Sequence, residues 1–394
     1  MRIDKLTEHM KLASYYLTEV ACNRDDTPIG QRGAKMTLIR SWKGALRGEY
    51  YASTKTWDVF CPCWHTGQAV KALVMAADVL NDKTLLEKAS YLAHFLTDNQ
   101  VTSGEEAGML PAYEDHPLKI NTSAVLESLD GLLMLAEATG NDQWKQSALN
   151  ALDWVIRKMW HPETGKFYDS YNPIEHAIDP GVTGGYSQRP LLDDALLVTA
   201  WKLTGDRQYL DIAIAVGETL LREENPAGNW VGILPCLPER KLIHPRHAYW
   251  WGKPMMPLYQ ATGDKRFLEL FKRSMNWYDK AIRIDGGMFR NTRTDFATDT
   301  FGQATSGSAC AAICFMEMAQ LENADYWRSR AELTLDFCCA VQFIHPSDSN
   351  LKGAILEKIL PPDGSDASPY FIRDLGTIFF LQAAAMYLKR YSAL

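Results

Sequence analysis

The sequence lacks an excess of basic residues, and this absence argues against two classes of partner. Its 394 residues include 41 Lys and Arg against 48 Asp and Glu, which gives a formal net charge of −7. Nucleic acids and anionic membrane surfaces both favour a basic face. We therefore expect neither as a partner. An anionic small molecule is not excluded, because it responds to the local field rather than to the net charge.

Long apolar runs are also missing. Charged residues are scattered through the N-terminal segment, which has no unbroken apolar stretch of the kind found in signal peptides. No segment approaches the length that a membrane-spanning helix needs. The sequence predicts a cytoplasmic protein.

The cysteines do not form the paired motifs of a metal site or a disulfide framework. Cys61 and Cys63 are the only pair with a spacing close to that of a metal clip, and no second pair accompanies them. Cys310 and Cys314 lie within one expected helix. Such positions are typical of buried, reduced thiols. We expect no metal site and no cofactor.

What the sequence does contain is a repeat of helix, tight polar turn and helix. In each turn a Gly or Asn can end one helix in the left-handed conformation, and an Asp or Asn can cap the next helix. Each repeat therefore predicts one αα-hairpin. The five turns cover residues 80–82, 139–142, 204–206, 262–264 and 322–325.

The first and last expected helices, about 3–21 and 370–391, have no hairpin partner of their own. Pairing them with each other gives six hairpins and twelve helices. An open solenoid would need polar caps on its terminal repeats, whereas the last helix is apolar almost all round. No linker-like segment divides the chain. We predict an all-α fold, with residues 1–394 forming a single (α/α)6-barrel catalytic domain.

The connections alternate between tight turns and loops of roughly twenty residues or more, and long loops in compact domains are usually functional. All the long loops fall at one end of the predicted toroid, which we call the mouth. The helices that follow them are the more apolar and should form the inner ring; they cover residues 69–80, 124–138, 191–203, 254–261, 309–321 and 375–388. Their N-termini would favour an anion at the mouth.

Aromatic and ionisable residues are frequent in these loops and in the first turns that follow them. Aromatic rings stack on the C–H faces of sugars, and carboxylates serve as acids and bases in glycosidic chemistry. The pattern therefore predicts a carbohydrate site. The candidate substrate-binding residues are Trp57, Trp64, His65, His116, Arg189, Arg246, His247, Trp250, Trp251, Lys253 and Ser306.

Asp193 and Asp194 are the strongest catalytic candidates. Both lie within the apolar stretch 190–203. Burying a carboxylate costs free energy that must be offset. We therefore expect one of the two side chains to face the mouth.

Several of these segments resemble one known family. Leu191-Leu192-Asp193-Asp194-Ala195, Asp115-His116, Trp250-Trp251-Gly252-Lys253 and Thr305-Ser306-Gly307-Ser308 are similar to segments of the unsaturated glucuronyl and unsaturated rhamnogalacturonyl hydrolases. These are glycoside hydrolase families 88 and 105, within the six-hairpin glycosidases. The chain departs from the family in having Lys253 where a fourth-loop Arg is usual.

The resemblance implies hydration of the 4,5 double bond of an unsaturated uronic acid, followed by release of the aglycone. It implies Asp194 as general acid, Asp193 as second choice and Asp115 as partner. Arg246, His247 or Lys253 would hold the substrate carboxylate. No metal or cofactor is implied. The expected partner is an anionic oligosaccharide, and the protein would be a monomer or homodimer.

Three alternatives remain open from the sequence. A uronate polysaccharide lyase would need a Tyr or His base and an Arg or Lys that neutralises the carboxylate. The candidates are His244, Arg246, His247 and Tyr249. An N-acylglucosamine 2-epimerase-like sugar epimerase would need paired histidines at the mouth. A non-enzymatic glycan-binding scaffold would keep the aromatic residues but leaves Asp193 and Asp194 unexplained.

Overall fold

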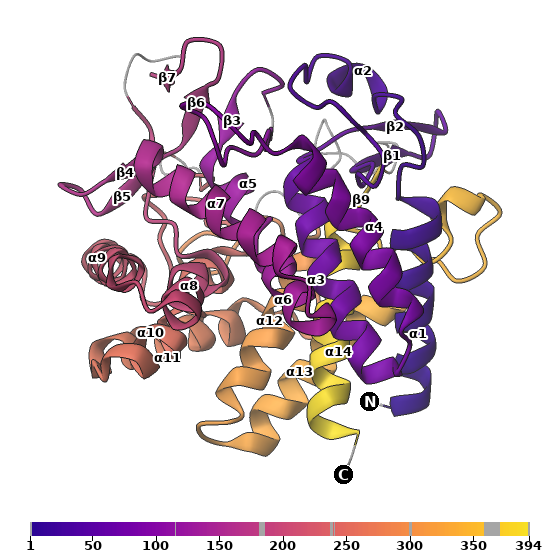
Figure 1. Cartoon of the computed structure of the whole chain (residues 1–394). Coiled ribbons are helices and arrows are strands. Elements are labelled where there is room, and N and C mark those ends of the chain that lie inside the picture. The colour runs from indigo at the N-terminus through magenta and orange to yellow at the C-terminus, as the bar shows by residue number, and fades with distance from the viewer. Residues whose placement is uncertain are drawn as a thin grey trace.

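The computed structural model describes residues 2–114, 116–180, 186–236, 239, 241–298, 302–357 and 371–392. Its helices follow one another as antiparallel pairs (Figure 1). Five pairs are joined by tight turns: α3 (Pro62–Leu80) with α4 (Thr84–Asn99), α6 (Asp130–Thr139) with α7 (Asp142–Met159), α8 (Leu196–Thr204) with α9 (Arg207–Glu223), α10 (Met255–Thr262) with α11 (Lys265–Ala281), and α12 (Thr305–Met318) with α13 (Ala324–Ala340).

The first and last helices form the sixth pair and close the ring. α14 (Leu375–Tyr391) packs against α1 (Ile3–Tyr15), and also against the inner helices α3 and α12. α3 in turn packs against α6. The predicted six-hairpin (α/α)6 toroid is therefore confirmed. That residues 1–394 act as one domain stays a prediction.

The tight turns use the capping chemistry expected from the sequence. Gly205, with φ 75°, and Gly263, with φ 73°, end α8 and α10 in the left-handed region. The side chain of Asp206 accepts a hydrogen bond from the backbone N–H of Gln208 at 2.9 Å. Such caps satisfy groups that a helix end leaves without partners. They keep these connections short, at the end of the toroid away from the mouth.

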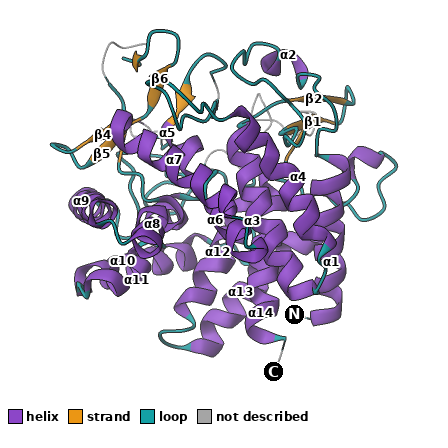
Figure 2. Cartoon of the chain, in the orientation of Figure 1, coloured by secondary structure: helices purple, strands orange, loops and turns teal. Residues whose placement is uncertain are grey.

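The long connections fold into three small antiparallel sheets, which the all-α prediction did not include. Figure 2 shows the strands set apart from the tight helix turns. Segments of two or three residues are too short to show an alternating pattern. The sheets are β2 (Thr56–Asp58), β1 (Glu49–Tyr51) and β9 (Phe371–Arg373); β3 (Ile120–Asn121), β6 (Ser170–Asn172) and β7 (Ala177–Ile178); and β4 (Trp160–His161), β5 (Lys166–Tyr168) and β8 (Gln188–Arg189).

In the part of the chain that the structure describes, six shorter helical segments accompany these helices, and three of them precede inner helices. They are α2 (Gly30–Gly33), α5 (Thr122–Leu126), two π-helical turns, Tyr16–Val20 and Ala248–Gly252, and two 3-10 turns, Asp193–Ala195 and Ser349–Leu351. Apolar side chains from all the long helices form one continuous core. All eight cysteines are buried in it as free thiols. Among the described residues, no helix combines the length and apolar character needed to cross a membrane.

Candidate active site

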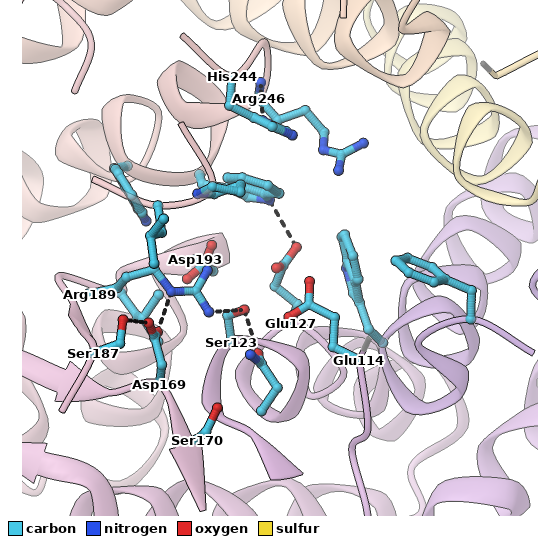
Figure 3. A pocket seen from close by; sticks show the side chains of 18 of the residues that line it. Glu114, Ser123, Glu127, Asp169, Ser170, Ser187, Arg189, Asp193, His244 and Arg246 are labelled. Atoms are coloured by element: carbon cyan, nitrogen blue, oxygen red, sulfur yellow. Dashed lines mark hydrogen bonds and ion pairs between the residues drawn. The ribbon is translucent and has the colours of Figure 1, made fainter. Parts of the chain in front are cut away.

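A polar cavity of about 480 Å³ opens at the end of the toroid where the long connections meet. This is the end at which the loop lengths predicted a site. Figure 3 shows Glu127 and Glu114 near its centre, with Arg246 above them and Arg189 and Asp169 to one side. The lining residues are Phe60, Trp64, Glu114, Asn121, Ser123, Glu127, Asp169, Ser170, Ser187, Arg189, Leu191, Asp193, Leu234, Pro235, His244, Arg246, Trp250, Trp251, Arg290 and Arg373.

Two buried carboxyl groups, those of Asp193 and Glu127, line this cavity. Burial raises the pKa of Asp193 to about 7, although the nearby charge of Arg189 opposes the shift. Burial and the negative charges of Asp193 and Asp194 raise the pKa of Glu127 well above its ordinary value. Both groups can therefore carry a proton near neutral pH.

The two carboxyl groups have different local partners. Glu127 Oε2 accepts a hydrogen bond from the indole Nε1 of Trp250 at 3.0 Å. Asp193 Oδ2 is buried and has no hydrogen-bond partner among the described residues. A buried acid with an unsatisfied oxygen is unusual, since most buried polar atoms in proteins are paired. Asp193 is therefore the better placed of the two to transfer a proton to a bound molecule.

The backbone beside Asp193 explains why only one of the two adjacent aspartates faces the cavity. Asp193 begins a short 3-10 helical turn, Asp193–Ala195, that leads into α8. Asp194 has φ 53° and Ala195 has φ 55°, so two consecutive non-glycine residues lie in the left-handed region. That conformation is costly for residues with a β-carbon and is found where surrounding contacts enforce it. As a result, Asp193 lines the cavity and Asp194 does not.

Asp194 is instead held in a buried polar network between inner helices. Its carboxylate accepts hydrogen bonds from Lys71 Nζ at 2.7 Å, Gln68 Nε2 at 2.8 Å and Tyr249 Oη at 3.3 Å. Lys71 Nζ also lies 2.8 Å from Asp130 Oδ2.

This network fixes the ionisation state of Asp194. Burial alone would raise its pKa, but the charges of Lys71 and Lys253 and the hydrogen bonds hold the pKa below its ordinary value. An ionised carboxylate cannot donate a proton. The structure therefore reverses the order that the sequence suggested, and Asp193 replaces Asp194 as the candidate acid. Asp115, the predicted partner, lies outside the described residues.

One wall of the cavity is a polar cluster that the sequence did not reveal. Asp169 accepts hydrogen bonds from Arg189 Nε and from the hydroxyl of Ser187. Arg189 Nη2 donates to Ser123 Oγ at 3.1 Å. Because Asp169 neutralises Arg189, this wall is polar but carries little net charge.

Five of the predicted substrate-binding residues line the cavity, namely Trp64, Arg189, Arg246, Trp250 and Trp251. The guanidinium carbon of Arg246 lies 5.6 Å from the ring centroid of Trp64 and 5.0 Å from that of Trp250. Its Nη1 donates to Ser306 Oγ at 2.7 Å. Ser306 is fully buried and does not line the cavity. It therefore orients Arg246 rather than contacting a ligand in the cavity.

Three other predicted residues do not line the cavity either. Trp57 lies on β2, where its ring packs 4.8 Å from that of Tyr50. His65 is fully buried, with its ring 5.6 Å from that of Phe60. His116 is exposed, and its Nδ1 accepts a hydrogen bond from its own loop. Scaffold packing or local loop structure accounts for each of these side chains.

His247 and Lys253 were predicted to hold a carboxylate, and their surroundings do not support that role. The ring of His247 is fully buried, 4.3 Å from that of Trp251. Burial lowers the pKa of His247 to about 3, so the ring is neutral. Lys253 Nζ lies 5.2 Å from the ring centroid of Tyr249, and its charge acts on Asp194. Neither residue lines the cavity.

His244 is the only histidine among the described residues that line the cavity. Its ring stacks on Trp250 at 4.9 Å, and its Nδ1 accepts a hydrogen bond from the backbone N–H of Arg246 at 3.2 Å. Within the described ranges, no three His, Cys, Asp or Glu side chains gather in a way that could hold a metal ion.

The cavity lining also includes five charged residues that were not among the predicted site residues: Glu114, Glu127, Asp169, Arg290 and Arg373. Glu127 could have been recognised, because it is a charged residue within the apolar stretch 124–138 and thus carries the same signal as Asp193. Arg373 and Asp169 carried no comparable signal. They reach the cavity through short strands and loops that the pattern did not predict.

Comparison with known proteins identifies the fold but not the activity. No family model matches the chain, and no curated protein matches it in sequence. An unsaturated glucuronyl hydrolase specific for heparin superposes with a TM-score of 0.70 at 16% identity, covering 99% of this chain and 98% of that one.

Two further structures have the same architecture. A sugar epimerase from a ruminal bacterium gives a TM-score of 0.70 at 12% identity, covering 99% of both chains. An unsaturated glucuronyl hydrolase from Streptococcus agalactiae, in complex with dGlcA-GalNAc6S, gives 0.62 at 13%, covering 99% of this chain and 92% of that one. At these identities the similarity establishes the toroid, which hydrolases and epimerases share.

Proposed function

We propose that this chain is a glycoside hydrolase that acts on oligosaccharides ending in a 4,5-unsaturated uronic acid. The observation that carries the proposal is the buried Asp193 carboxyl, whose pKa is raised to about 7, in a cavity that it shares with Glu127. Enzymes prepare a general acid for neutral pH by raising a carboxyl pKa in this way. Similarity in fold to unsaturated glucuronyl hydrolases adds support.

In the proposed reaction, protonated Asp193 donates its proton to C4 of the vinyl ether. Positive charge then develops at C5, where water adds. The Asp193 carboxylate takes up the proton that the water releases, which restores the acid. The resulting hemiketal opens and expels the aglycone. The ionised carboxylate of Asp194 would help to keep Asp193 protonated, because its negative charge raises the pKa of Asp193.

Arg246 is the proposed anchor for the substrate carboxylate, and Trp64 and Trp250 would stack on the sugar. A charge-assisted hydrogen bond to such an anchor contributes about 1.5–3 kcal/mol, or roughly ten- to a hundredfold in affinity. Calorimetry on an Asp193→Asn variant should therefore show that much tighter binding of an unsaturated uronyl disaccharide than of the same sugar reduced to the C6 alcohol. Equal affinities would remove Arg246 as a carboxylate anchor.

Activity should depend on pH through Asp193. The acid must be protonated, and burial raises its pKa to about 7. kcat/KM should therefore fall as the pH rises through about 7, since this parameter reports on the free enzyme. A pH–rate profile measures this fall in kcat/KM. A kcat/KM that stays constant between about pH 6 and about pH 8 would contradict the assignment of Asp193 as the general acid.

The alternative activities have less support at this cavity. A two-histidine epimerase needs paired rings, whereas His244 is the only histidine among the described lining residues. For a lyase, the candidate base Tyr249 donates toward Asp194, and burial raises its pKa well above the ordinary value. A Tyr in that state is a poor base near neutral pH.

Product analysis tests the proposal against these alternatives. The protein would be incubated with unsaturated uronyl disaccharides, and the near-ultraviolet absorbance of the conjugated double bond would be followed over time. A loss of absorbance with release of the second sugar is expected. A gain of absorbance on intact polysaccharide would indicate a lyase, and sugar isomerisation without any change would indicate an epimerase.

A further inference from the structure

Four guanidinium groups line the cavity, and three of them face a carboxylate. The four residues are Arg189, Arg246, Arg290 and Arg373. The pairs are Arg189 with Asp169, Arg246 with Glu357 at 3.6 Å, and Arg373 with Glu49, whose Oε1 lies 2.8 Å from Nε. The charges of Arg189 and Arg373 are compensated by direct hydrogen bonds to their carboxylates. That of Arg246 is compensated only in part, because its carboxylate lies beyond hydrogen-bond distance and its Nε has no hydrogen-bond partner among the described residues.

Arg290 is the exception. No described carboxylate lies within ion-pair distance of it, and its Nη1 is buried without a hydrogen-bond partner among the described residues. Burial and the positive charges of Arg246 and Arg373 lower its pKa to about 9, although the more distant charge of Glu357 opposes the shift, and Arg290 stays charged at neutral pH. An uncompensated charge at a desolvated position is costly. Its presence in the cavity wall is accounted for if a ligand supplies the missing anion.

Backbone hydrogen bonds hold the segment around Arg290 in place. Its N–H donates to the carbonyl of Gly302 at 2.7 Å. Two residues further on, Thr292 and Ile243 exchange backbone hydrogen bonds of 3.3 and 2.7 Å. The guanidinium therefore enters the cavity from a segment that is held on both sides. Little conformational entropy would be lost when it binds an anion.

The charges of the other cavity residues also favour an anionic ligand at Arg290. Asp193 and Glu127 are the carboxyls whose pKa values are raised by burial, so they do not neutralise Arg290 when protonated. Glu114 is a further carboxyl group of the cavity lining, and no ion pair joins it to Arg290 among the described residues. With the other arginines facing carboxylates, Arg290 is the lining guanidinium that no described carboxylate neutralises at short range. A planar guanidinium fork matches the oxygens of a sulfate or carboxylate.

We infer that Arg290 binds a second anionic group of the substrate, separate from the carboxylate that Arg246 would hold. The group is an oxyanion attached to the sugar, either a sulfate ester or a second carboxylate. This inference rests on the proposed function, because it extends the same substrate class to doubly anionic oligosaccharides. It makes Arg290 a specificity-determining residue that discriminates between substrates and takes no part in proton transfer.

Steady-state kinetics on three unsaturated disaccharides would test the inference. One carries only the uronate carboxylate, one carries an additional sulfate ester, and one carries a second carboxylate. The native protein should show a kcat/KM about tenfold or more higher on at least one doubly anionic substrate, the usual worth of a charge-assisted contact. The doubly anionic substrate with the higher kcat/KM shows whether the second anionic group is a sulfate ester or a carboxylate.

Arg290→Gln should remove this preference, so that kcat/KM on the doubly anionic substrate falls about tenfold further than kcat/KM on the singly anionic one, because only the doubly anionic substrate loses a charge-assisted contact. Arg290→Lys should restore part of it. Arg207→Gln is the matched control, since Arg207 is exposed on α9 and pairs with Asp211. A preference that survives in Arg290→Gln would overturn the inference. So would an equal loss on all three substrates, because Arg290 would then bind the first carboxylate.

Binding of inorganic sulfate gives a readout that does not need turnover. Calorimetric titration should show sulfate binding to the native protein and to Arg207→Gln about tenfold more tightly than to Arg290→Gln. Equal binding in all three proteins would overturn the anion site. If Arg290 governs sulfate binding but no unsaturated disaccharide is consumed, the proposed function fails while the anion site remains.

Discussion

Replacing Asp193 with asparagine is expected to lower kcat by about a hundredfold to ten-thousandfold, the range for a positioned general acid. The amide has nearly the same shape as the carboxyl group but cannot deliver a proton to C4. Because burial disfavours the charged form of Asp193, its neutral replacement should not destabilise the fold. Kinetics on an unsaturated uronyl disaccharide, with a thermal melt of the same sample, measure both effects.

Asp211→Asn is the matched control for that experiment. Asp211 is an exposed aspartate on α9 that does not line the cavity and pairs with Arg207. Its replacement should change neither kcat nor the melting temperature appreciably. If Asp193→Asn keeps near-native turnover on every disaccharide that the native protein cleaves, Asp193 is not the acid, and Glu127 becomes the next candidate.

Replacing Lys71 with methionine is expected to have the largest effect on stability. Lys71 is almost fully buried and pairs with both Asp130 and Asp194 at 2.8 and 2.7 Å. Removing the cation would leave two carboxylates without their counter-ion, and breaking a buried pair in this way costs about 3–5 kcal/mol. Urea denaturation measures the change in the free energy of unfolding.

The same substitution should also reduce catalysis, because Asp194 anchors the left-handed turn that points Asp193 into the cavity. The protein that remains folded should therefore show a lower kcat. The pH at which its kcat/KM falls should also shift. Lys145→Met provides the control, since Lys145 is partly exposed and pairs with the exposed Asp142 on the surface of α7. Its loss should cost at most about 1 kcal/mol. Equal effects of the two substitutions would contradict a structural role for the buried network.

The toroid could be predicted because its signals are local in the sequence. A turn such as Thr204-Gly205-Asp206 contains both the left-handed residue that ends α8 and the cap that starts α9. The apolar final helix needed a partner on every side, which required a closed ring. The strands could not be predicted in the same way. β1 pairs with β9 through Glu49 and Arg373, far apart in the chain, and neither strand is long enough to show a pattern.

The cavity was predictable in part. Asp193 was predicted because burying a carboxyl group within an apolar stretch costs free energy that other contacts must offset. Glu127 could have been predicted by the same reasoning. The choice between Asp193 and Asp194 could not be made from the pattern. It depends on the positive φ values of Asp194 and Ala195, and an alanine gives no sign of such a conformation in the sequence.

Two of the predicted histidines do not line the cavity for a different reason. His65 and His247 were placed at the mouth because they lie in the long connections and the first turns that follow them, but both rings are fully buried. Helical geometry sends adjacent residues in directions about a quarter-turn or more apart, so neighbours in sequence do not share a face. Trp64 therefore lines the cavity while His65 packs inside the scaffold.

The central claim is that Asp193 protonates C4 of an unsaturated uronide and that water then adds at C5. NMR of the reaction in D2O tests it most directly. The vinyl proton signal should disappear as the second sugar is released, with one deuterium incorporated at C4 of the product, and Asp193→Asn should abolish the incorporation. Release of the second sugar with the double bond intact, or deuterium exchange at another carbon without cleavage, would contradict the account.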